Sequence, residues 1–195
     1  MEERIINADQ NPELLDAMRL LLRAGGEDPD REGLLETPAR FLRAWQEWTS
    51  GYAENPSEIL KTFDDGAASY DEMVLVRDIP VYSLCEHHLA PFFGVAHVGY
   101  LPHGRIVGLS KLNRLVGAYS RRLQVQERLT TQVADTLYEA LKPHGVAVML
   151  ECRHLCMESR GIRQPGAATV TSAMRGHIKD DAKSRAEFLT LISRR

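Results

Sequence analysis

Metal-ligating and acid–base side chains gather in two short segments of this chain. The first, S-L-C-E-H-H-L-A-P-F-F, places a thiol, a carboxylate and two imidazoles at the consecutive positions Cys85 to His88. Cysteine at position i and histidine at i+3 fall on the same side of one helical turn, and thiolate and imidazole are ligands that zinc prefers. The second segment, H-L-C, ends in Cys156. We therefore predict a zinc site formed by Cys85, His88 and Cys156.

Three protein ligands leave a fourth position for water, which is typical of catalytic rather than structural zinc. Zinc lowers the pKa of such a water to about 7 and makes it a usable nucleophile. A plainer interpretation stays open, because a buried cysteine is most often a small hydrophobic residue. Cys152 is a conceivable fourth thiolate, but residues on one side of a strand from Cys152 to Cys156 span too far to reach one ion. We interpret Cys152 as a packing residue.

Two histidines lie beside the predicted ligands without being needed as ligands. His87 is between Cys85 and His88, and His154 is two residues before Cys156. Imidazole titrates near neutral pH, so histidines next to a reactive water are natural proton donors and acceptors. A hydrogen-bonded histidine that only orients the site is the alternative for each. We predict that His87 and His154 transfer protons.

Cationic residues occur in two places that suit an anionic ligand. Ser110 and Lys111 stand at the predicted start of a helix with Arg114 one turn on, and helix N-termini with fixed charges bind phosphate. Arg160 follows Cys156 by four residues. A basic helix face is more often simply solvated. Glu127 falls in the first turn of another predicted helix, where a carboxylate favours the helix dipole and could equally hold a donor-rich heterocycle.

The composition is that of a globular protein large enough for a well-filled core. The chain has 195 residues, 44% of them hydrophobic and 26% charged, and a formal net charge of −3. No global basic field indicates nucleic acid or an anionic membrane as a partner, and no apolar run approaches the roughly 20 residues of a membrane span. The first residues lack the apolar core of a signal peptide, and three cysteines do not make a disulfide framework. We expect a cytoplasmic protein.

The N-terminal part of the chain predicts two helices. Asn11-Pro12 begins the first and Gly25-Gly26 ends it, while Thr37-Pro38 begins the second, with Phe41, Trp45 and Trp48 on one side. Gly51 ends the second helix. We expect residues 1–51 to form an N-terminal helical region and residues 52–72 a loop-like connection with a turn at 64–66.

Residues 73–195 predict a mixture of strands and helices. We expect strands at Met73–Ile79, stopped by Pro80, at Gly94–Leu101, at Val146–His154 with an extension that includes Cys156, and at Ala168–Met174. Ser110 is expected to cap one helix, a second runs from about Val125 to Lys142, and a third covers Asp180–Arg195. Together these elements predict an α+β fold with a largely antiparallel sheet, and we expect 73–195 to be the catalytic domain.

Several motifs together resemble the GTP cyclohydrolase I family. They are S-L-C-E-H-H-L-A-P-F, G-L-S-K-L-N-R, Q-V-Q-E-R-L-T and H-L-C-M-E-S-R-G, with G-E-D-P-D-R-E-G-L-L-E-T-P-A-R-F near the N-terminus. The likeness extends over about residues 13–192, and four spaced motifs in the right order are highly specific. The resemblance implies a T-fold (tunnelling fold) subunit with an N-terminal helical pair, assembled as a toroidal homodecamer with active sites at subunit interfaces.

The resemblance also implies a reaction and a set of site residues. GTP would undergo zinc-dependent hydrolysis of its guanine imidazole ring with release of formate, and reclosure would give 7,8-dihydroneopterin triphosphate, the first step of pterin and tetrahydrofolate biosynthesis. Cys85, His88 and Cys156 would hold zinc, and His87 and His154 would be the proton-transfer pair. The substrate would be bound by Glu127 at the guanine, by Ser110, Lys111, Arg114 and Arg160 at the triphosphate, and by Arg40 of a neighbouring subunit, with Gln126 as a further substrate-binding residue.

Two other functions stay open on the sequence. One is a different T-fold enzyme that acts on a pterin or a deazaguanine, although a C-E-H-H segment paired with H-L-C argues against the three-histidine and metal-free sites of such enzymes. The other is a zinc-stabilised interaction module without catalysis, which predicts a closed site with four ligands and loss of the fold on chelation.

Overall fold

The computed structural model describes residues 8–63 and 69–193, and these fall into two units, one ending at Ser50 and the other beginning at Gly51. The first unit is helical. It contains α1 (Pro12–Ala24), α2 (Thr37–Trp48) and two short 3-10 turns, Ala8–Gln10 and Glu32–Leu34. The Asn11 side chain caps α1 by accepting hydrogen bonds from the backbone N–H groups of Glu13 and Leu14. Both predicted helices are therefore confirmed.

The second unit is built on a five-stranded sheet with the order β5-β2-β3-β6-β7. Its strands are β2 (Val74–Cys85), β3 (Pro91–Leu101), β5 (Leu123–Gln124), β6 (Gly145–His154) and β7 (Ala168–Gly176). Every neighbouring pair is antiparallel except β2 and the two-residue β5, which are parallel. A separate antiparallel pair is formed by β1 (Thr62–Phe63) and β4 (Ile106–Val107).

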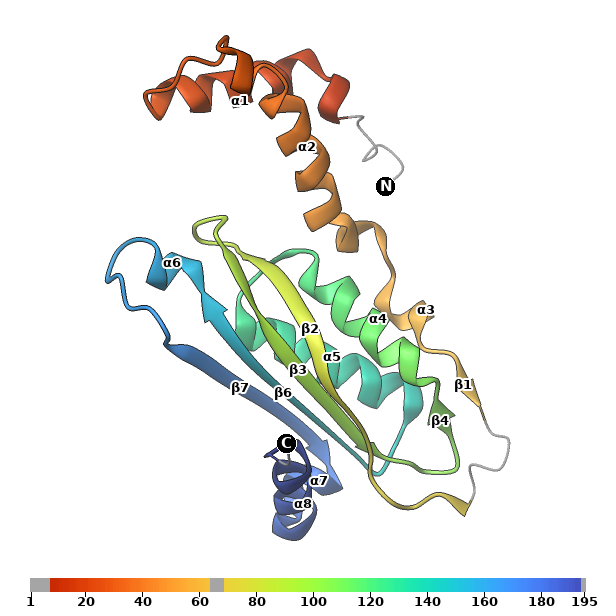
Figure 1. Cartoon of the computed structure of the whole chain (residues 1–195). Helices are drawn as coiled ribbons and strands as arrows, with labels where there is room; N and C mark the ends of the chain where they lie inside the picture. The colour runs from red at the N-terminus through yellow and green to blue at the C-terminus, as the bar shows by residue number, and fades with distance from the viewer. Residues whose placement is uncertain (1–7, 64–68, 194–195) are drawn as a thin grey trace. The chain divides into compact units, whose positions relative to one another are not determined.

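Helices α4 (Leu109–Ser120) and α5 (Gln126–Leu141) pack on one face of this sheet (Figure 1). Alternate residues of β6 point into that core from Val146 to Cys152, as period 2 predicts. On the other face, Phe188 of α8 (Ala182–Ser193) and Ile178 of α7 (His177–Asp180) bury themselves against Ala147. The prediction of an α+β fold with an antiparallel sheet flanked by helices is confirmed.

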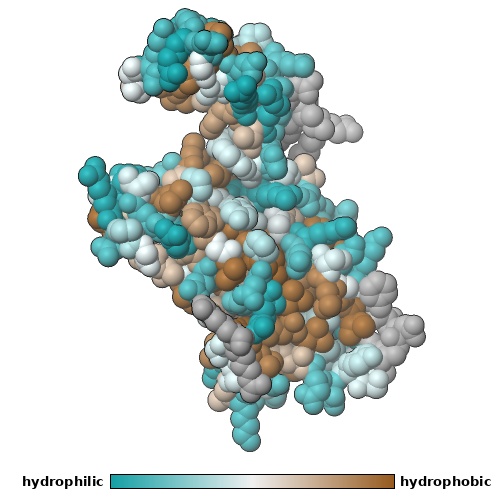
Figure 2. All heavy atoms as spheres, in the orientation of Figure 1, coloured by the Kyte–Doolittle hydropathy of each residue, from teal (hydrophilic) through white to brown (hydrophobic). Residues whose placement is uncertain are grey.

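Side chains at the surface of the second unit are not uniformly polar. Figure 2 shows hydrophobic residues gathered on its visible face, over the region where α4, α5 and the sheet lie in Figure 1. Tyr82 on β2 is 73% exposed, and Val170 on β7 is more than half exposed. No helix within the described ranges is long and apolar enough to cross a membrane.

The sheet departs from the sequence prediction at Pro80. We expected Pro80 to stop its strand, but β2 continues through it to Cys85, and Pro80 pairs with Val95. The reason is that β5 pairs with β2 only at Leu84 and Cys85, so Pro80 lies where β2 is an edge strand on that side and needs no donor there. The register shifts between Val76 and Ile79, where Asp78 adopts a positive φ of 56°.

Three other predictions, two for helices and one for a loop, also need correction. The N-cap of α4 is Gly108, and Ser110 lies within the helix without capping it. The connection 52–72 is not all loop, because it holds α3 (Pro56–Ile59) and β1, while the predicted turn at 64–66 lies outside the described residues. The C-terminal helix is interrupted at Asp181, whose carboxylate accepts the Ser184 N–H at 2.7 Å and so starts α8.

Strand β6 ends at His154, and Cys156 belongs to the short helix α6 (Leu155–Glu158) instead of a strand extension. This correction matters for the site. Side chains follow a period of 3.6 residues in a helix instead of the period of 2 in a strand, so the side on which Cys156 lies is not given by the alternation along β6. Predicted strand and helix boundaries elsewhere in this unit are confirmed to within a few residues, with β3 beginning three residues before the expected Gly94.

Candidate active site

The order of the strands brings the two ligand segments to the same end of the sheet. Strands β2 and β6 are each antiparallel to β3, so they run in the same direction and end at the same edge. Ser83, Phe92 and His154 form one row across the three strands. Cys85 lies two residues beyond Ser83 at the end of β2, and Cys156 lies in α6 directly after His154, so both thiols come from the same end of the sheet.

A single tight turn after β2 positions the histidines. The carbonyl of Cys85 accepts the backbone N–H groups of Leu89 at 2.8 Å and of His88 at 3.3 Å, and the Cys85 N–H donates to the carbonyl of Ala90 at 2.8 Å. Leu89 adopts a positive φ of 54° where the turn reverses into β3. This is the helical turn that the C-E-H-H spacing predicts, and it places His88 on the same side as Cys85.

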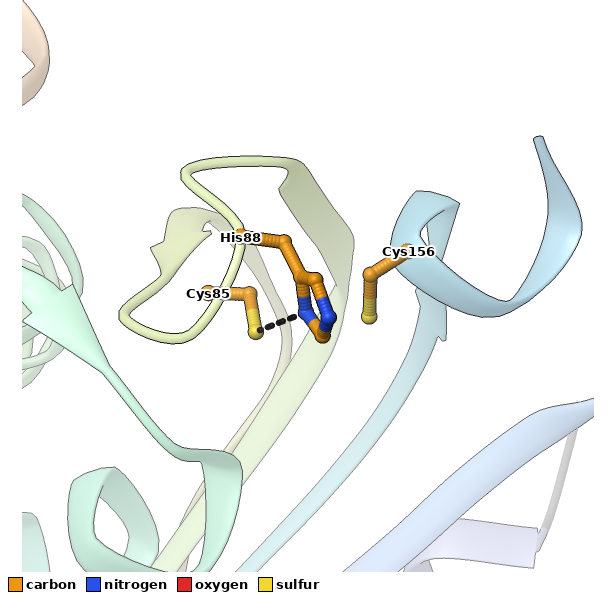
Figure 3. Close-up of side chains that lie close together, drawn as sticks. All are labelled: Cys85, His88 and Cys156. Carbon is orange, nitrogen blue, oxygen red and sulfur yellow. Dashed lines mark hydrogen bonds between the residues drawn. The ribbon is translucent and has the colours of Figure 1, made fainter. Parts of the chain in front are cut away.

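Cys85, His88 and Cys156 converge, as Figure 3 shows, with all their ligand atoms within 4.8 Å of one another. The sulfur of Cys85 is 3.8 Å from Nδ1 of His88. Ligand atoms on one tetrahedral zinc lie roughly 3.5–3.8 Å apart, given Zn–S and Zn–N bonds of about 2.3 and 2.0 Å. The donor set and its spacing therefore fit a zinc ion with little rearrangement.

Without a cation, the Cys156 thiol favours its protonated form. Burial raises the pKa of Cys156, and the neighbouring Cys85 raises it further, while Arg160 opposes the shift. A metal ion reverses this preference by stabilising thiolate, so binding must release protons. Among the described residues no other group of histidine, cysteine or carboxylate side chains converges in this way.

An ion pair fastens the ligand turn to α5. The carboxylate of Glu86 is bonded to the guanidinium of Arg128, which lowers the pKa of Glu86. Arg128 also donates to Oε1 of Gln124 at 3.0 Å, and the Glu86 N–H donates to the Gln124 carbonyl at 3.0 Å. Sequence reasoning did not single out Arg128, since nothing in the chain marks which of its arginines faces the ligand turn.

His154 lies beside the cluster and is held from two sides. Its ring stacks on Phe92, with centroids 4.7 Å apart and an interplanar angle of 7°. Its Nε2 lies 2.8 Å from Oε1 of Gln126. Burial lowers the pKa of His154, and the carboxylate of Glu127 works against that shift. A histidine that stays neutral and fixed in orientation is suited to accept a proton.

His87 is presented differently. Its side chain is mostly exposed, its Nε2 is 3.8 Å from the carboxylate of Glu86, and its ring meets His88 edge-on. It therefore projects from the ligand turn toward solvent, where a substrate or another chain can reach it. Its predicted role in proton transfer stays a prediction.

The predicted phosphate residues are not all near the cluster within one chain. Ser110, Lys111 and Arg114 lie in the first half of α4, whereas Cys85 is beside Gln124, which follows the other end of that helix. Twelve residues of helix span about 18 Å, and Figure 1 shows the two ends of α4 well apart. Arg160, by contrast, lies close enough to Cys156 to affect its pKa.

The remaining predicted residues have the following surroundings. Glu127 is exposed in the first turn of α5, near His154. The side chain of Gln126 is 1% exposed. Arg40 is exposed on α2 and pairs with Glu36 in the N-terminal unit. Cys152 is 1% exposed within the core and lies outside the ligand cluster, which supports its interpretation as a packing residue.

Comparison with known proteins identifies a family that matches most of this chain. The model of the GTP cyclohydrolase I family matches residues 14–193. A protein of Nitrosospira multiformis named GTP cyclohydrolase 1 is 65% identical over 171 residues, which cover 88% of this chain and 90% of the relative. One of the same name from Janthinobacterium sp. is 61% identical, covering 89% and 87%.

Among solved structures, the archaeosine synthase QueF-Like in its apo form aligns with a TM-score of 0.43 and 19% identity, covering 53% of this chain and 93% of that one. We draw nothing from a likeness at that level. The family match spans nearly all of the sequence, including both ligand segments, and the relatives match at high identity over most of their own length. This chain belongs to the GTP cyclohydrolase I family.

Proposed function

We propose that this protein opens the guanine imidazole ring of GTP by zinc-dependent hydrolysis, releases formate, and recloses the product to 7,8-dihydroneopterin triphosphate. The observation that carries the proposal is the convergence of Cys85, His88 and Cys156 beside His154, a half-buried histidine whose pKa is lowered by burial. This proposed reaction is the entry step to pterin and tetrahydrofolate synthesis.

Cys85, His88 and Cys156 would hold the zinc ion. When bound, zinc supplies a Lewis acid that makes water nucleophilic near neutral pH. His154, fixed by Phe92 and Gln126, would accept and return protons at the purine ring. His87, exposed on the ligand turn, would serve as the second proton-transfer group. A site with three protein ligands fits catalysis better than a closed structural site.

The substrate would be held by residues of more than one chain. Glu127, next to His154 in the first turn of α5, suits the N–H donors of the guanine edge. Arg160 is near the cluster, but Ser110, Lys111 and Arg114 are at the far part of α4. A triphosphate clamp that includes all four therefore needs α4 of a neighbouring subunit, and we assign Arg40 to the same composite clamp.

Two features support assembly into a toroidal homodecamer. In the described part of the chain, β7 has a hydrogen-bonded neighbour only on its β6 side, and β5 covers only two residues of β2. Edge strands of this kind pair readily with another chain. The exposed residues Tyr82 and Val170 lie on β2 and β7. Apolar side chains at these positions favour contact with a second copy of the chain.

We further propose that residues 73–195 are the catalytic T-fold domain, that residues 1–51 are an N-terminal helical region, and that 52–72 connects them. Three free cysteines, two of them needed as thiolates, suit a reducing compartment. We therefore place the enzyme in the cytoplasm.

The decisive experiment is incubation of the purified protein with GTP, before and after chelation, with assays for formate and for a new pterin chromophore. Both products should appear, disappear on chelation and return when zinc is added. If bound zinc and an intact oligomer give no product, the proposal is wrong and other T-fold substrates, pterins or deazaguanines, should be tried. If chelation unfolds the subunit, the zinc is structural and the interaction-module hypothesis is favoured.

A further inference from the structure

Gln126 is buried in the core at the start of α5, although a substrate-binding role would call for an accessible side chain. Only 1% of the residue is exposed. Its side-chain nitrogen lies 3.2 Å from the carbonyl of Leu150 and 2.9 Å from the carbonyl of Thr169. It lies 3.1 Å from the hydroxyl of Thr171. The nitrogen of this amide is therefore surrounded by hydrogen-bond partners from within the protein.

The orientation of this amide is determined by its neighbours. Leu150 and Thr169 present carbonyl oxygens, which only accept hydrogen bonds, so the group facing them must be the NH₂ of Gln126. In the flipped orientation three oxygens would face one another without a proton between them, which is costly in a buried site.

The hydroxyl chain next to the amide runs in the same direction. Thr130 donates to the backbone carbonyl of Gln126 at 2.7 Å, so the 2.7 Å contact between the two threonine hydroxyls must have Thr171 as its donor. The Thr171 oxygen then accepts from the Gln126 amide. Each of these three hydrogen bonds therefore has only one possible donor, and together they fix the orientation of the Gln126 amide.

This fixed amide decides which nitrogen of His154 carries a proton. With the NH₂ directed into the core, Oε1 of Gln126 faces His154, and the 2.8 Å contact to Nε2 needs a proton from the imidazole. A neutral imidazole has one N–H, so Nδ1 is left as the unprotonated nitrogen. Stacking on Phe92 holds the ring plane in which this contact is made.

We propose that Gln126 is a positioning residue whose side-chain carbonyl holds His154 in the Nε2-protonated tautomer, so that Nδ1 is the nitrogen that exchanges protons with the substrate. The tautomer follows from contacts within the chain, and only the exchange with substrate rests on the proposed function. Holding a histidine through its second nitrogen is a general way to set the nitrogen that reacts.

The first test examines the tautomer itself and needs no turnover. Zinc-loaded protein labelled with ¹⁵N-histidine is measured by solid-state NMR near neutral pH, and the His154 signals are assigned by their loss in a His154→Asn variant. We expect one ring nitrogen with an attached proton at Nε2 and an unprotonated Nδ1. A proton on Nδ1, or an even mixture of the two tautomers, would overturn the proposal.

The second test separates positioning from substrate contact with two variants. Gln126→Met keeps the size of the side chain but removes the acceptor for His154. Thr171→Val removes one partner of the same amide, yet leaves the Leu150 and Thr169 carbonyls to hold it. We expect Gln126→Met to lower kcat by roughly 10- to 100-fold with KM for GTP unchanged, and to spread the His154 signal over both tautomers. Thr171→Val should change kcat and the tautomer less than Gln126→Met does, because the two carbonyls still orient the amide.

Three other outcomes have distinct meanings. A raised KM with unchanged kcat in Gln126→Met would make Gln126 a substrate contact and would contradict a positioning role. If Gln126→Met does not fold, the spectrum of the wild-type protein still decides the tautomer. If the wild-type protein shows the expected tautomer but does not turn over GTP, the proposed function fails while the assignment of the histidine holds.

Discussion

At the scale of single residues, the chain contains cysteines of opposite character only four positions apart. Cys156 is half-buried and faces Cys85 and His88, whereas Cys152 is 1% exposed among apolar side chains. Burial raises the pKa of Cys152 to about 12, which favours a neutral thiol, and Cys152 lies outside the group formed by Cys85, His88 and Cys156. The two residues form a natural pair of test and control.

Cys156→Ala should abolish zinc binding and GTP turnover together, because two ligands are too few to hold the ion against water. Cys152→Ala should keep one zinc per chain and most of the activity, and lower the free energy of unfolding by roughly 1 kcal/mol through lost packing. Zinc content by elemental analysis and formate release are measured on the same preparations. Retained zinc stoichiometry in Cys156→Ala would remove it from the ligand set.

Residue types and spacing were enough to predict which side chains converge, but not how they are held. The C-x-x-H spacing predicts a single helical turn, and the structure has that turn at Cys85, closed by hydrogen bonds to its carbonyl oxygen. The prediction that Cys156 lies on a strand was wrong because α6 begins directly after His154, and a four-residue helix leaves little periodic signal. Arg128 and Phe92 were missed for another reason: their roles depend on strand register and on a contact 42 positions away in sequence.

At the scale of elements, the closest backbone approach near the site occurs where β3 pairs with β6. Gly94 pairs with Cys152, and a Cβ at Gly94 would lie 2.0 Å from the Glu151 carbonyl oxygen and 2.7 Å from Cα of Cys152. Both are backbone atoms that cannot rotate away. Gly117, in the middle of α4, has no such neighbour within 4 Å.

Gly94→Ala should therefore lower the free energy of unfolding by roughly 3 kcal/mol or more, and should also reduce turnover, because Phe92 and its stacked partner His154 lie two residues from the distortion. Gly117→Ala should be neutral or stabilising by up to about 1 kcal/mol, as expected for alanine in a helix. Denaturant unfolding monitored by circular dichroism compares the two. Equal effects of the two substitutions would contradict the close approach of β3 and β6.

Element types followed from sequence better than element ends. The helix Pro12–Ala24 was predictable because its cap, its glycines and its apolar spacing agree. The helix Gln126–Leu141 was predictable from its apolar spacing, which ends just before Pro143. Pro80 was misinterpreted because whether a strand tolerates proline depends on which side has a neighbour, and that is a property of the sheet. Local sequence does not contain it.

At the scale of the whole molecule, a buried histidine links stability to pH. His97 on β3 is 6% exposed, and its Nδ1 accepts the Asp78 N–H at 3.3 Å. Burial lowers its pKa below 6.5, Arg77 lowers it further, and Asp78 and Glu151 oppose this. In the unfolded chain His97 binds a proton below about pH 6.5, whereas in the folded protein it does so only at lower pH.

The unfolded state therefore gains protons first as the pH falls, so the stability that His97 contributes is complete above about pH 6.5 and is lost progressively below it. We expect the denaturation midpoint to decline from pH 7 to pH 5, above the range in which the lowered carboxylates titrate. In a His97→Gln variant this decline should be shallower than in the wild type. An identical slope in both proteins would show that other groups, such as His154, carry the effect.

The composite nature of the proposed site is also a property of the whole molecule. The metal cluster lies near one end of α4 and the proposed phosphate residues lie near the other end, so the proposed clamp would combine parts of two chains. The sequence places Lys111 within 26 positions of Cys85 and gives no sign of this separation. The position of Lys111 along α4, known only from the fold, is what leads us to propose that the clamp comes from a neighbouring copy.

Mixing two inactive variants tests that separation. Cys156→Ala lacks the metal site but keeps the clamp, and Lys111→Ala keeps the metal site but lacks a clamp residue. If each active site joins the cluster of one chain to the α4 of another, oligomers reassembled from equal amounts should regain roughly one quarter of the wild-type activity per chain, because some interfaces then combine two intact halves. Each variant reassembled alone is the control. No gain on mixing, with mixed oligomers demonstrated by mass spectrometry, would mean that one chain supplies both halves.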